Sequence, residues 1–285
     1  LAKHLTVFQR TPNWVVPRND QVITDEQKAL FMTAPEIALK LGAAQREAIW
    51  ENADYFFWQA FEWTPEGRAA FTRQARDHLE AQVPDPDLRA RLTPDYPIGC
   101  KRILITDDFY PALMRGNVDL VTVPIDAINA WGVKGDDGVQ HDLDVLIYAT
   151  GFETTGWHWS MDVTGEGGTR LNTLWADHPE AYLGTTVAGF PNLFVLYGPN
   201  TNLGHNSIIY MLECQIEYMI KALQAAENAG AKALSPTQAA QDRFNADLQA
   251  RLAKTVWADP HCISWYKNAQ GRITQNWYGP TRDFA

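Results

Sequence analysis

Short apolar runs alternate with amphipathic repeats along the chain, which is the pattern of an α/β protein. Residues 5–8 form a β-rich run near the start, and two longer apolar runs, 144–149 and 192–197, predict buried strands. Each longer run leads into a glycine, Gly151 or Gly198, which permits a sharp turn. The pattern therefore predicts strands that end in tight turns.

The stretch from Thr24 to about residue 92 has helical periodicity. Thr24 precedes two acidic residues and is expected to cap the first helix. An aromatic-rich stretch, 50–63, is too dense for one helical stripe. We interpret it either as the core of a small helical subdomain, which we favour, or as one wall of a substrate cavity. A later helix is indicated by apolar residues at four-residue intervals: Phe71, Ala75, Leu79 and Val83.

Signals typical of β-structure return at about residue 96. Short strands are expected over 102–106 and 117–123, with a short helix between them. A hairpin or meander over 125–149 is broken by the turn sequence Gly-Asp-Asp-Gly at 135–138.

Two long helices are expected near the end of the chain. The first begins at Ser207 and ends near residue 226, and the second, capped by Ser235, ends near Trp257. A hairpin in the tail is expected to turn near Gly271. The first helix carries an apolar stripe that we expect to face the core, formed by Ile208, Leu212, Ile216, Met219 and Leu223.

Composition excludes several classes of protein. The chain has 285 residues, of which 46% are apolar and 20% are charged, so it has the composition of a folded domain rather than of a disordered segment. Its net charge is −10, which argues against binding to nucleic acid or to an anionic membrane. No apolar run approaches the roughly 18 residues of a membrane span.

The cysteines and histidines show no metal-binding or disulfide pattern. Cys100, Cys214 and Cys262 form no CxxC pair and leave an odd count, so neither a disulfide framework nor a zinc site is expected. A reducing, cytoplasmic location fits this composition best. His158 and His178 lack a metal-ligand spacing, and no bound metal is expected.

Three segments carry candidate binding residues, because ligands of open α/β sheets bind at the carboxyl ends of strands. Arg10 and Thr11 follow the first strand, where they could hold an NADP 2′-phosphate or be solvated surface residues. Thr150 and Gly151 form a turn that a ligand could approach closely, although such a turn is common. The small and amide residues of 198–207 precede a helix and could be an ordinary capped loop or a cradle for a cofactor.

Lys101 and Arg102 are adjacent cations at the start of a predicted strand. In an acidic chain such a pair can attract an anionic ligand, although solvation at the surface is the usual explanation.

Several segments, taken in order, resemble the Baeyer–Villiger type of class B flavin-dependent monooxygenase, and the resemblance extends over nearly the whole chain. The matching segments are Val-Phe-Gln-Arg-Thr-Pro-Asn-Trp at 7–14, Gly-Cys-Lys-Arg at 99–102, the run from Asp144 through Ala-Thr-Gly-Phe at 149–152, Gly-Phe-Pro-Asn-Leu-Phe at 189–194, Gly-Pro-Asn at 198–200, and Ser-Trp-Tyr at 264–266.

This resemblance implies an α/β fold, namely a partial, Rossmann-like flavoprotein fold with two dinucleotide-binding domains and a helical insertion. Residues 1–22 would form an incomplete first segment of the NADP-binding domain, and 23–95 the helical insertion. Residues 96–152 would return to the NADP-binding domain, and 153–285 would be the C-terminal part of the FAD-binding domain.

The resemblance also implies a reaction. In that family NADPH reduces FAD, and the reduced flavin reacts with O₂ to form a C4a-peroxyflavin. This species inserts oxygen into a small-molecule ketone or oxidises a heteroatom. Arg102 would match the arginine that stabilises the negative charge of the peroxyflavin.

Cofactor roles follow from the same resemblance. Arg10 and Thr11 would bind the NADP 2′-phosphate with help from Lys101, and Trp265 would close over NADP. The turn with Thr150 and Gly151 would mark the crossover between the cofactor domains. The segment that would pass near the isoalloxazine ring contributes Gly198, Leu203 and Asn206.

The glycine motifs with which the family binds FAD and the NADP pyrophosphate are absent from the chain. We therefore expect a C-terminal fragment of a longer enzyme, which alone binds FAD poorly and is inactive. Two alternatives remain open: a flavin monooxygenase that oxygenates nitrogen or sulfur, and a non-catalytic fragment that forms homo-oligomers through surface that the rest of the enzyme would cover.

Overall fold

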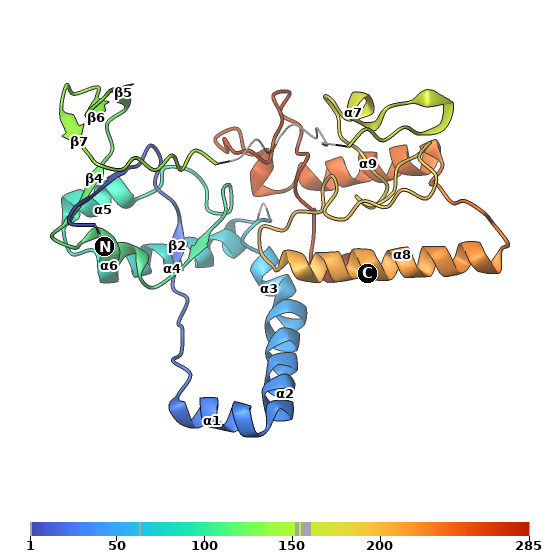
Figure 1. Ribbon diagram of the computed structural model, residues 1–285, viewed down its shortest axis with the longest axis horizontal. Coiled ribbons are helices and arrows are strands. Elements are labelled where there is room, and N and C mark those ends of the chain that lie inside the picture. Colours follow the sequence, from blue (N-terminus) through green and yellow to red (C-terminus); the bar gives the residue numbers. More distant parts are fainter. Residues whose placement is uncertain (1, 63, 152–153, 155–160, 285) are drawn as a thin grey trace. The chain divides into compact units, whose positions relative to one another are not determined.

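The structure is a computed structural model that describes residues 2–62, 64–151, 154 and 161–284 (Figure 1). The chain divides into two compact units. Unit 1 contains Leu1–Asp20, Ala70–Tyr96 and Arg102–Glu153, and unit 2 contains Gln21–Ala69, Pro97–Lys101 and Thr154–Ala285. The expected helical insertion, 23–95, is therefore divided between the units, within helix α4 (Pro65–Gln82).

Unit 1 contains two small parallel sheets. Strand β1 (Leu5–Phe8) pairs with β4 (Val118–Val121), and β2 (Val15–Val16) pairs with β3 (Leu104–Ile105). Three expected strands are therefore confirmed, although the one predicted over 102–106 has only two paired residues.

The core of unit 1 is formed where helices pack on these strands. Helix α4 presents the predicted apolar face, and Phe71, Ala75, Leu79 and Val83 are all buried. Helices α5 (Pro86–Leu92) and α6 (Phe109–Leu113) contribute to the same cluster. The members of the cluster are Val15, Leu79, Val83, Leu92, Tyr110, Leu113 and Leu120.

The expected meander is also present in unit 1. Strands β5 (Ile125–Ile128), β6 (Gly132–Gly135) and β7 (Gln140–Asp142) form an antiparallel sheet, drawn in green in Figure 1. The predicted turn at 135–138 is closed by a 2.9 Å hydrogen bond from the Gly135 amide to the Val139 carbonyl.

The prediction of a buried strand over 144–149 is wrong. Val145, Ile147 and Tyr148 are between 66% and 79% exposed, and no strand is assigned there. A strand with two apolar faces is buried only when neighbouring strands and a covering layer are present. Within the part of the chain that the structure describes, no strand pairs with this segment.

Unit 2 contains most of the helices. Its N-terminal part has α1 (Asp25–Thr33), α2 (Pro35–Arg46), the π-helical η1 (Glu47–Asn52) and α3 (Asp54–Trp58). The predicted cap is confirmed, because the Thr24 hydroxyl accepts from the Gln27 amide while the Gln27 side chain accepts from the Thr24 amide. The remaining short elements of unit 2 are η2 (Glu166–Gly168), α7 (Leu171–Leu174), η3 (Val256–Ala258) and η4 (Thr281–Asp283).

The longest helix, α8 (Ile208–Asn228), begins after the predicted N-cap Ser207, but the predicted stripe is only partly correct (Figure 1). Met211, Cys214 and Gln215 are its buried residues, whereas Ile216 and Leu223 are exposed. The apolar positions of α8 cover most of its circumference, so periodicity alone did not identify the buried face.

Helix α9 (Gln238–Leu252) begins later and ends earlier than expected. Its N-cap is Thr237, whose hydroxyl accepts from the Ala240 amide, and Ser235 is not the cap. The prediction chose Ser235 because proline follows it. Two Ser/Thr residues two positions apart can each cap, and the local geometry selected the second.

The run 192–197 forms no regular strand, although Val195 is buried and Thr186 bridges to Phe194. In the tail, Lys267 bridges to Ile273 and the chain reverses at Gly271, whose φ is +78°. The predicted tail hairpin is therefore confirmed.

Two apolar clusters stabilise unit 2. One contains Leu171, Trp175, Ala181, Val187, Phe190 and Val195. The other is aromatic, and its rings are those of Trp58, Phe61, His205, Trp257 and Tyr266. The core interpretation of the aromatic-rich stretch therefore holds for Trp58 and Phe61, whereas Phe56 is exposed. Trp63, Phe152 and His158 lie outside the described residues.

The structure corrects the expectation about cysteines. Cys100 and Cys262 form a disulfide across a sequence separation of 162 residues, and Cys214 is free and buried. Sequence spacing did not reveal the pair because the segment 97–101 belongs to unit 2, where the Trp257 indole donates to the Gly99 carbonyl at 3.1 Å.

We predict that the unfolded, unreduced protein reacts with a thiol reagent at one cysteine, and that the reduced protein reacts at three. The native protein should react at none, because burial raises the pKa of the Cys214 thiol to about 11. Cys100→Ser should lower the free energy of unfolding by about 2–5 kcal/mol, since the disulfide closes a long loop. Mass spectrometry after alkylation provides the count, and three labelled cysteines without reductant would contradict the pairing.

Candidate functional site

The loop that precedes α8 in unit 2 is closely packed and conformationally restrained. A Cβ atom at Gly198 would lie 2.2 Å from the Gly184 carbonyl oxygen, so only glycine fits there. Tyr197 and Asn200 adopt positive φ values of 57° and 59°, which are uncommon for residues other than glycine. Such backbone geometry persists only where surrounding contacts impose it.

Amide side chains supply those contacts. Asn200 Nδ2 donates to the carbonyls of Ile273 and Asn276 at 2.9 and 3.1 Å. Asn202 Nδ2 donates to Asn276 Oδ1 at 2.6 Å. The loop is therefore attached to the second strand of the tail hairpin by side chains that lie inside the protein.

A buried carboxylate organises the end of the loop. Asp54 is fully buried, and its Oδ1 accepts from His205 Nε2 at 3.0 Å, from Asn206 Nδ2 at 2.5 Å and from Thr281 Oγ1 at 3.0 Å. Its Oδ2 accepts from the Arg282 amide at 3.3 Å. One carboxylate thus connects helix α3, the 203–206 loop and the C-terminal tail.

Opposing effects act on the pKa of Asp54. Burial raises it, but hydrogen bonds from His205 and Asn206 lower it, and the net pKa is below the ordinary value. The group is therefore a carboxylate at neutral pH, stabilised by donors rather than by water.

His205 is held by the same carboxylate and by aromatic rings. Its side chain is 1% exposed, and the Trp58 ring meets it edge-on with centroids 5.2 Å apart. Because a carboxylate only accepts, the Nε2 atom of His205 carries a hydrogen. Its Nδ1 atom is buried, and no residue in the described part of the chain forms a hydrogen bond with it.

The three residues predicted to pass near a flavin all lie in this packed loop of unit 2. Gly198, Leu203 and Asn206 are all buried. The Asn206 side chain is fully engaged, because Nδ2 also donates to the Trp50 carbonyl at 2.8 Å and Oδ1 accepts from the Ser207 amide at 2.7 Å. Sequence analysis missed Asp54 and His205, which carried no motif that could have identified them.

Lys101 and Trp265 also belong to unit 2. Lys101 follows the disulfide-bonded Cys100, and Trp265 is 41% exposed with its ring 4.5 Å from that of buried Tyr266. The disulfide therefore joins the segment before Lys101 to the segment that precedes Trp265.

The other predicted residues belong to unit 1. Arg10 is exposed and Thr11 is partly buried just after β1, which the parallel pairing with β4 confirms as the carboxyl end of a parallel strand. Arg102 is exposed just before β3, and Thr150 and Gly151 are exposed, with Gly151 at φ +82°. The positive φ agrees with the predicted need for glycine at this turn.

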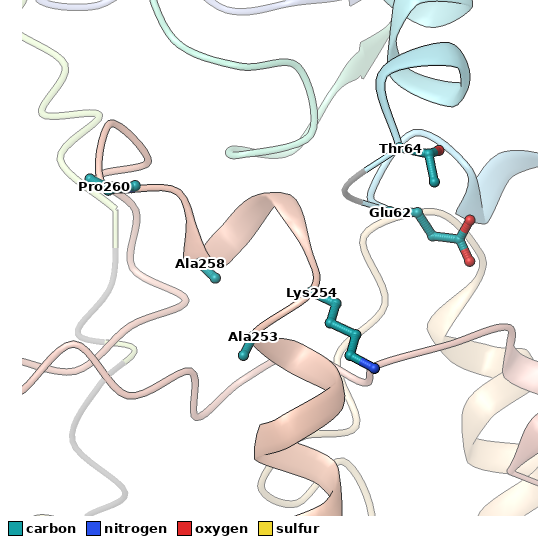
Figure 2. A pocket seen from close by; sticks show the side chains of 6 residues that line it. All are labelled: Glu62, Thr64, Ala253, Lys254, Ala258 and Pro260. Atoms are coloured by element: carbon teal, nitrogen blue, oxygen red, sulfur yellow. The ribbon is translucent and has the colours of Figure 1, made fainter.

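Unit 2 also contains an open cavity of about 620 Å³ (Figure 2). Glu62 and Lys254 place opposite charges on its wall, and small side chains complete the lining. The Glu62 carboxylate accepts from the Trp58 indole at 3.0 Å, so it is a fixed group of the wall. The complete lining is Glu62, Thr64, Ala253, Lys254, Ala258 and Pro260.

Membrane-spanning helices and metal-binding clusters are both absent from the described residues. No helix among them is both long and apolar enough to cross a membrane. In the same part of the chain, no three His, Cys, Asp or Glu side chains are grouped so that they could hold a metal ion.

The chain is similar to several monooxygenases, although no protein-family model matches it. Over 289 residues the chain is 37% identical to a Baeyer-Villiger monooxygenase from Pseudomonas aeruginosa, in a match that covers 100% of this chain and 53% of the relative. It is 40% identical over 284 residues to FAD-binding monooxygenase ktnD from Aspergillus niger, covering 97% of this chain and 45% of the relative. The solved structure of OTEMO in complex with FAD and NADP matches with a TM-score of 0.77 and 28% identity, over 99% of this chain and 59% of that chain.

The chain resembles the C-terminal portion of Baeyer–Villiger monooxygenases. The resemblance inferred from the sequence motifs is therefore confirmed. The chain spans about half the length of the curated Baeyer–Villiger relatives it matches.

We predict that Gly198→Ala lowers the free energy of unfolding by about 1–3 kcal/mol, because the new methyl group meets a backbone carbonyl that cannot rotate away. Gly42→Ala is the matched control. Gly42 lies within α2, where a methyl group would have no neighbouring atom within 4 Å, and alanine there should stabilise by up to about 1 kcal/mol. Denaturant unfolding of both variants measures the difference, and equal effects would show that the close packing at Gly198 is unimportant.

Proposed function

We propose that a protein containing this chain is an FAD- and NADPH-dependent monooxygenase that inserts one O₂-derived oxygen atom into a small-molecule ketone, which is a Baeyer–Villiger oxidation. The observation that carries the proposal is the identity of 37% with a Baeyer-Villiger monooxygenase over the whole chain. OTEMO, whose solved structure contains FAD and NADP, supports the choice of cofactors.

The chemistry of the residues in unit 1 fits a phosphorylated nucleotide. Arg10 offers a planar guanidinium to solvent at the carboxyl end of a parallel strand, next to the hydroxyl of Thr11. A guanidinium can donate two parallel hydrogen bonds to one phosphate, and the position at a strand end is where α/β sheets bind nucleotides. We assign the NADP 2′-phosphate to Arg10 and Thr11, with Lys101 as an additional cation.

The loop 198–206 would bind a flavin through its backbone rather than through charged side chains. Its amide side chains are engaged inside unit 2, so the groups it presents to a cofactor are those of its backbone. A backbone held in one conformation binds a rigid planar ring without an ordering cost at the moment of binding. Bound FAD, once reduced by NADPH, would supply the electrons that activate O₂.

Arg102 is the proposed catalytic residue. The residue is exposed, and its guanidinium would stabilise negative charge that develops on oxygen during the reaction without transferring a proton. Thr150 and Gly151 are proposed at the crossover between the cofactor domains, and Trp265 as the residue that closes over NADP. That the 285-residue chain alone binds FAD poorly stays a prediction.

The cofactor assignment predicts that Arg10→Ala, in a full-length protein containing this chain, raises KM for NADPH by roughly ten- to a hundred-fold, since two charge-assisted hydrogen bonds are lost. KM for NADH, which has no 2′-phosphate, should change little. Arg18→Ala is the matched control, because Arg18 is also exposed in unit 1 and pairs with Asp20. Steady-state kinetics with both cofactors test the assignment, and an equal change for NADH and NADPH would refute it.

The catalytic assignment predicts that Arg102→Ala reduces ester or lactone formation by at least about a hundred-fold, because a group that stabilises developing charge is lost. NADPH oxidation should continue, and Arg102→Lys should retain part of the product. Arg115→Ala, at another exposed cation of unit 1, should behave as the parent protein. Product chromatography together with NADPH consumption separates these outcomes, and unchanged ester formation would remove Arg102 from the mechanism.

A further inference from the structure

Asp54 is the most heavily engaged carboxylate among the described residues, and it lies on α3, far in sequence from the residues it contacts. His205 and Asn206 follow Asp54 by 151 and 152 residues, and Thr281 follows it by 227. A buried carboxylate is stable only when donors replace its water, so these segments must come to Asp54 together.

We propose that Asp54 is a positioning residue for the flavin. It fixes the imidazole of His205 and the amide of Asn206, and thereby sets the path of the 198–206 loop where it enters α8. This inference rests on the proposed function, which assigns that loop to the isoalloxazine ring.

The orientation of the His205 ring depends on its hydrogen bond to Asp54. The Nε2 atom of His205 bonds to Asp54, while Nδ1 has no hydrogen-bond partner among the described residues. Without Asp54, no described hydrogen bond would hold the ring in the orientation it adopts against Trp58. Asn206 Nδ2 donates to the Trp50 carbonyl as well as to Asp54, and its Oδ1 accepts from the Ser207 amide, so its position links the N-terminal helices of unit 2 to the start of α8.

Other contacts near the 198–206 loop accompany the hydrogen bonds of Asp54. Gly204 lies against Phe61, where a Cβ would come within 2.7 Å of the ring, so the loop approaches the aromatic cluster closely. Arg46 of α2 lies over the Trp50 ring at 5.0 Å and pairs with Glu213 of α8. Both side chains of that pair are exposed, which makes it a useful comparison with the buried Asp54.

The first test measures amide hydrogen exchange in the 285-residue chain. Asp54→Asn keeps the shape but removes the charge that three side-chain donors share. Exchange of the Ser207 and Arg282 amides should become roughly ten-fold faster, because the acceptor of the Ser207 amide, Asn206 Oδ1, loses its anchor and the acceptor of the Arg282 amide is the altered carboxylate itself. Protection in the cluster at 171–195 should not change. Unchanged exchange at Ser207 and Arg282 would overturn the proposal.

Control variants separate positioning from general destabilisation. Thr255→Val removes a buried hydroxyl that donates to the Leu252 carbonyl at 2.7 Å elsewhere in unit 2, and it should leave the Ser207 amide protected. Glu213→Gln should also leave the Ser207 amide protected. His205→Leu removes the donor to Asp54 and should abolish protection of the Ser207 amide. His205→Gln keeps a side-chain donor for Asp54, so much of that protection should remain. Equal exchange in the glutamine and leucine variants would count against the proposal.

The second test uses a full-length protein containing this chain. Asp54→Asn should weaken FAD binding by roughly ten-fold and lower the ratio of ester formed to NADPH consumed, while KM for NADPH stays constant because Arg10 is untouched. Simple loss of folded protein would lower all rates together and leave that ratio unchanged, and this result would overturn the proposal. If the parent protein itself neither holds FAD nor oxidises a ketone, the proposed function fails, and the exchange results still decide whether Asp54 positions the loop.

Discussion

The burial of one carboxylate constrains the architecture of unit 2 more than any other described interaction. Asp54 is fully buried, so its charge must be met by donors within the protein, which come from His205, Asn206, Thr281 and the Arg282 amide. Those donors come from segments that are remote in sequence. The cost of leaving a buried charge unpaired makes their convergence a condition of folding rather than an incidental contact.

Close packing of the backbone adds a second constraint on the same loop. At Gly198 the chain passes against the Gly184 carbonyl, and at Gly204 it passes against Phe61, so side chains are excluded at both positions. The amides of Asn200 and Asn202 then attach the loop to the tail hairpin. The backbone of the loop is therefore held in one conformation by contacts within unit 2.

Local elements were predictable because their causes are local. The capping box of Thr24 and Gln27, the apolar face of α4, the turn at 135–138 and the reversal at Gly271 depend on residues only a few positions apart. Apart from the N-cap of α9, which is Thr237 rather than Ser235, the errors occurred where burial depends on distant partners. The run 144–149 is as apolar as a buried strand, but no described strand pairs with it, and the exposed Ile216 and Leu223 lie on a helix that is apolar on several sides.

The sequence alone predicted the long helices and three of the paired strands of unit 1, the resemblance to Baeyer–Villiger monooxygenases, and the candidate cofactor residues that carry motifs, such as Arg10, Arg102 and Gly198. Only the tertiary structure decided that Cys100 joins Cys262 and that Asp54 holds His205 and Asn206. Motifs and periodicities record interactions between neighbours along the chain. A disulfide or a buried carboxylate depends on which distant segments meet in space, and no spacing in the sequence encodes that meeting.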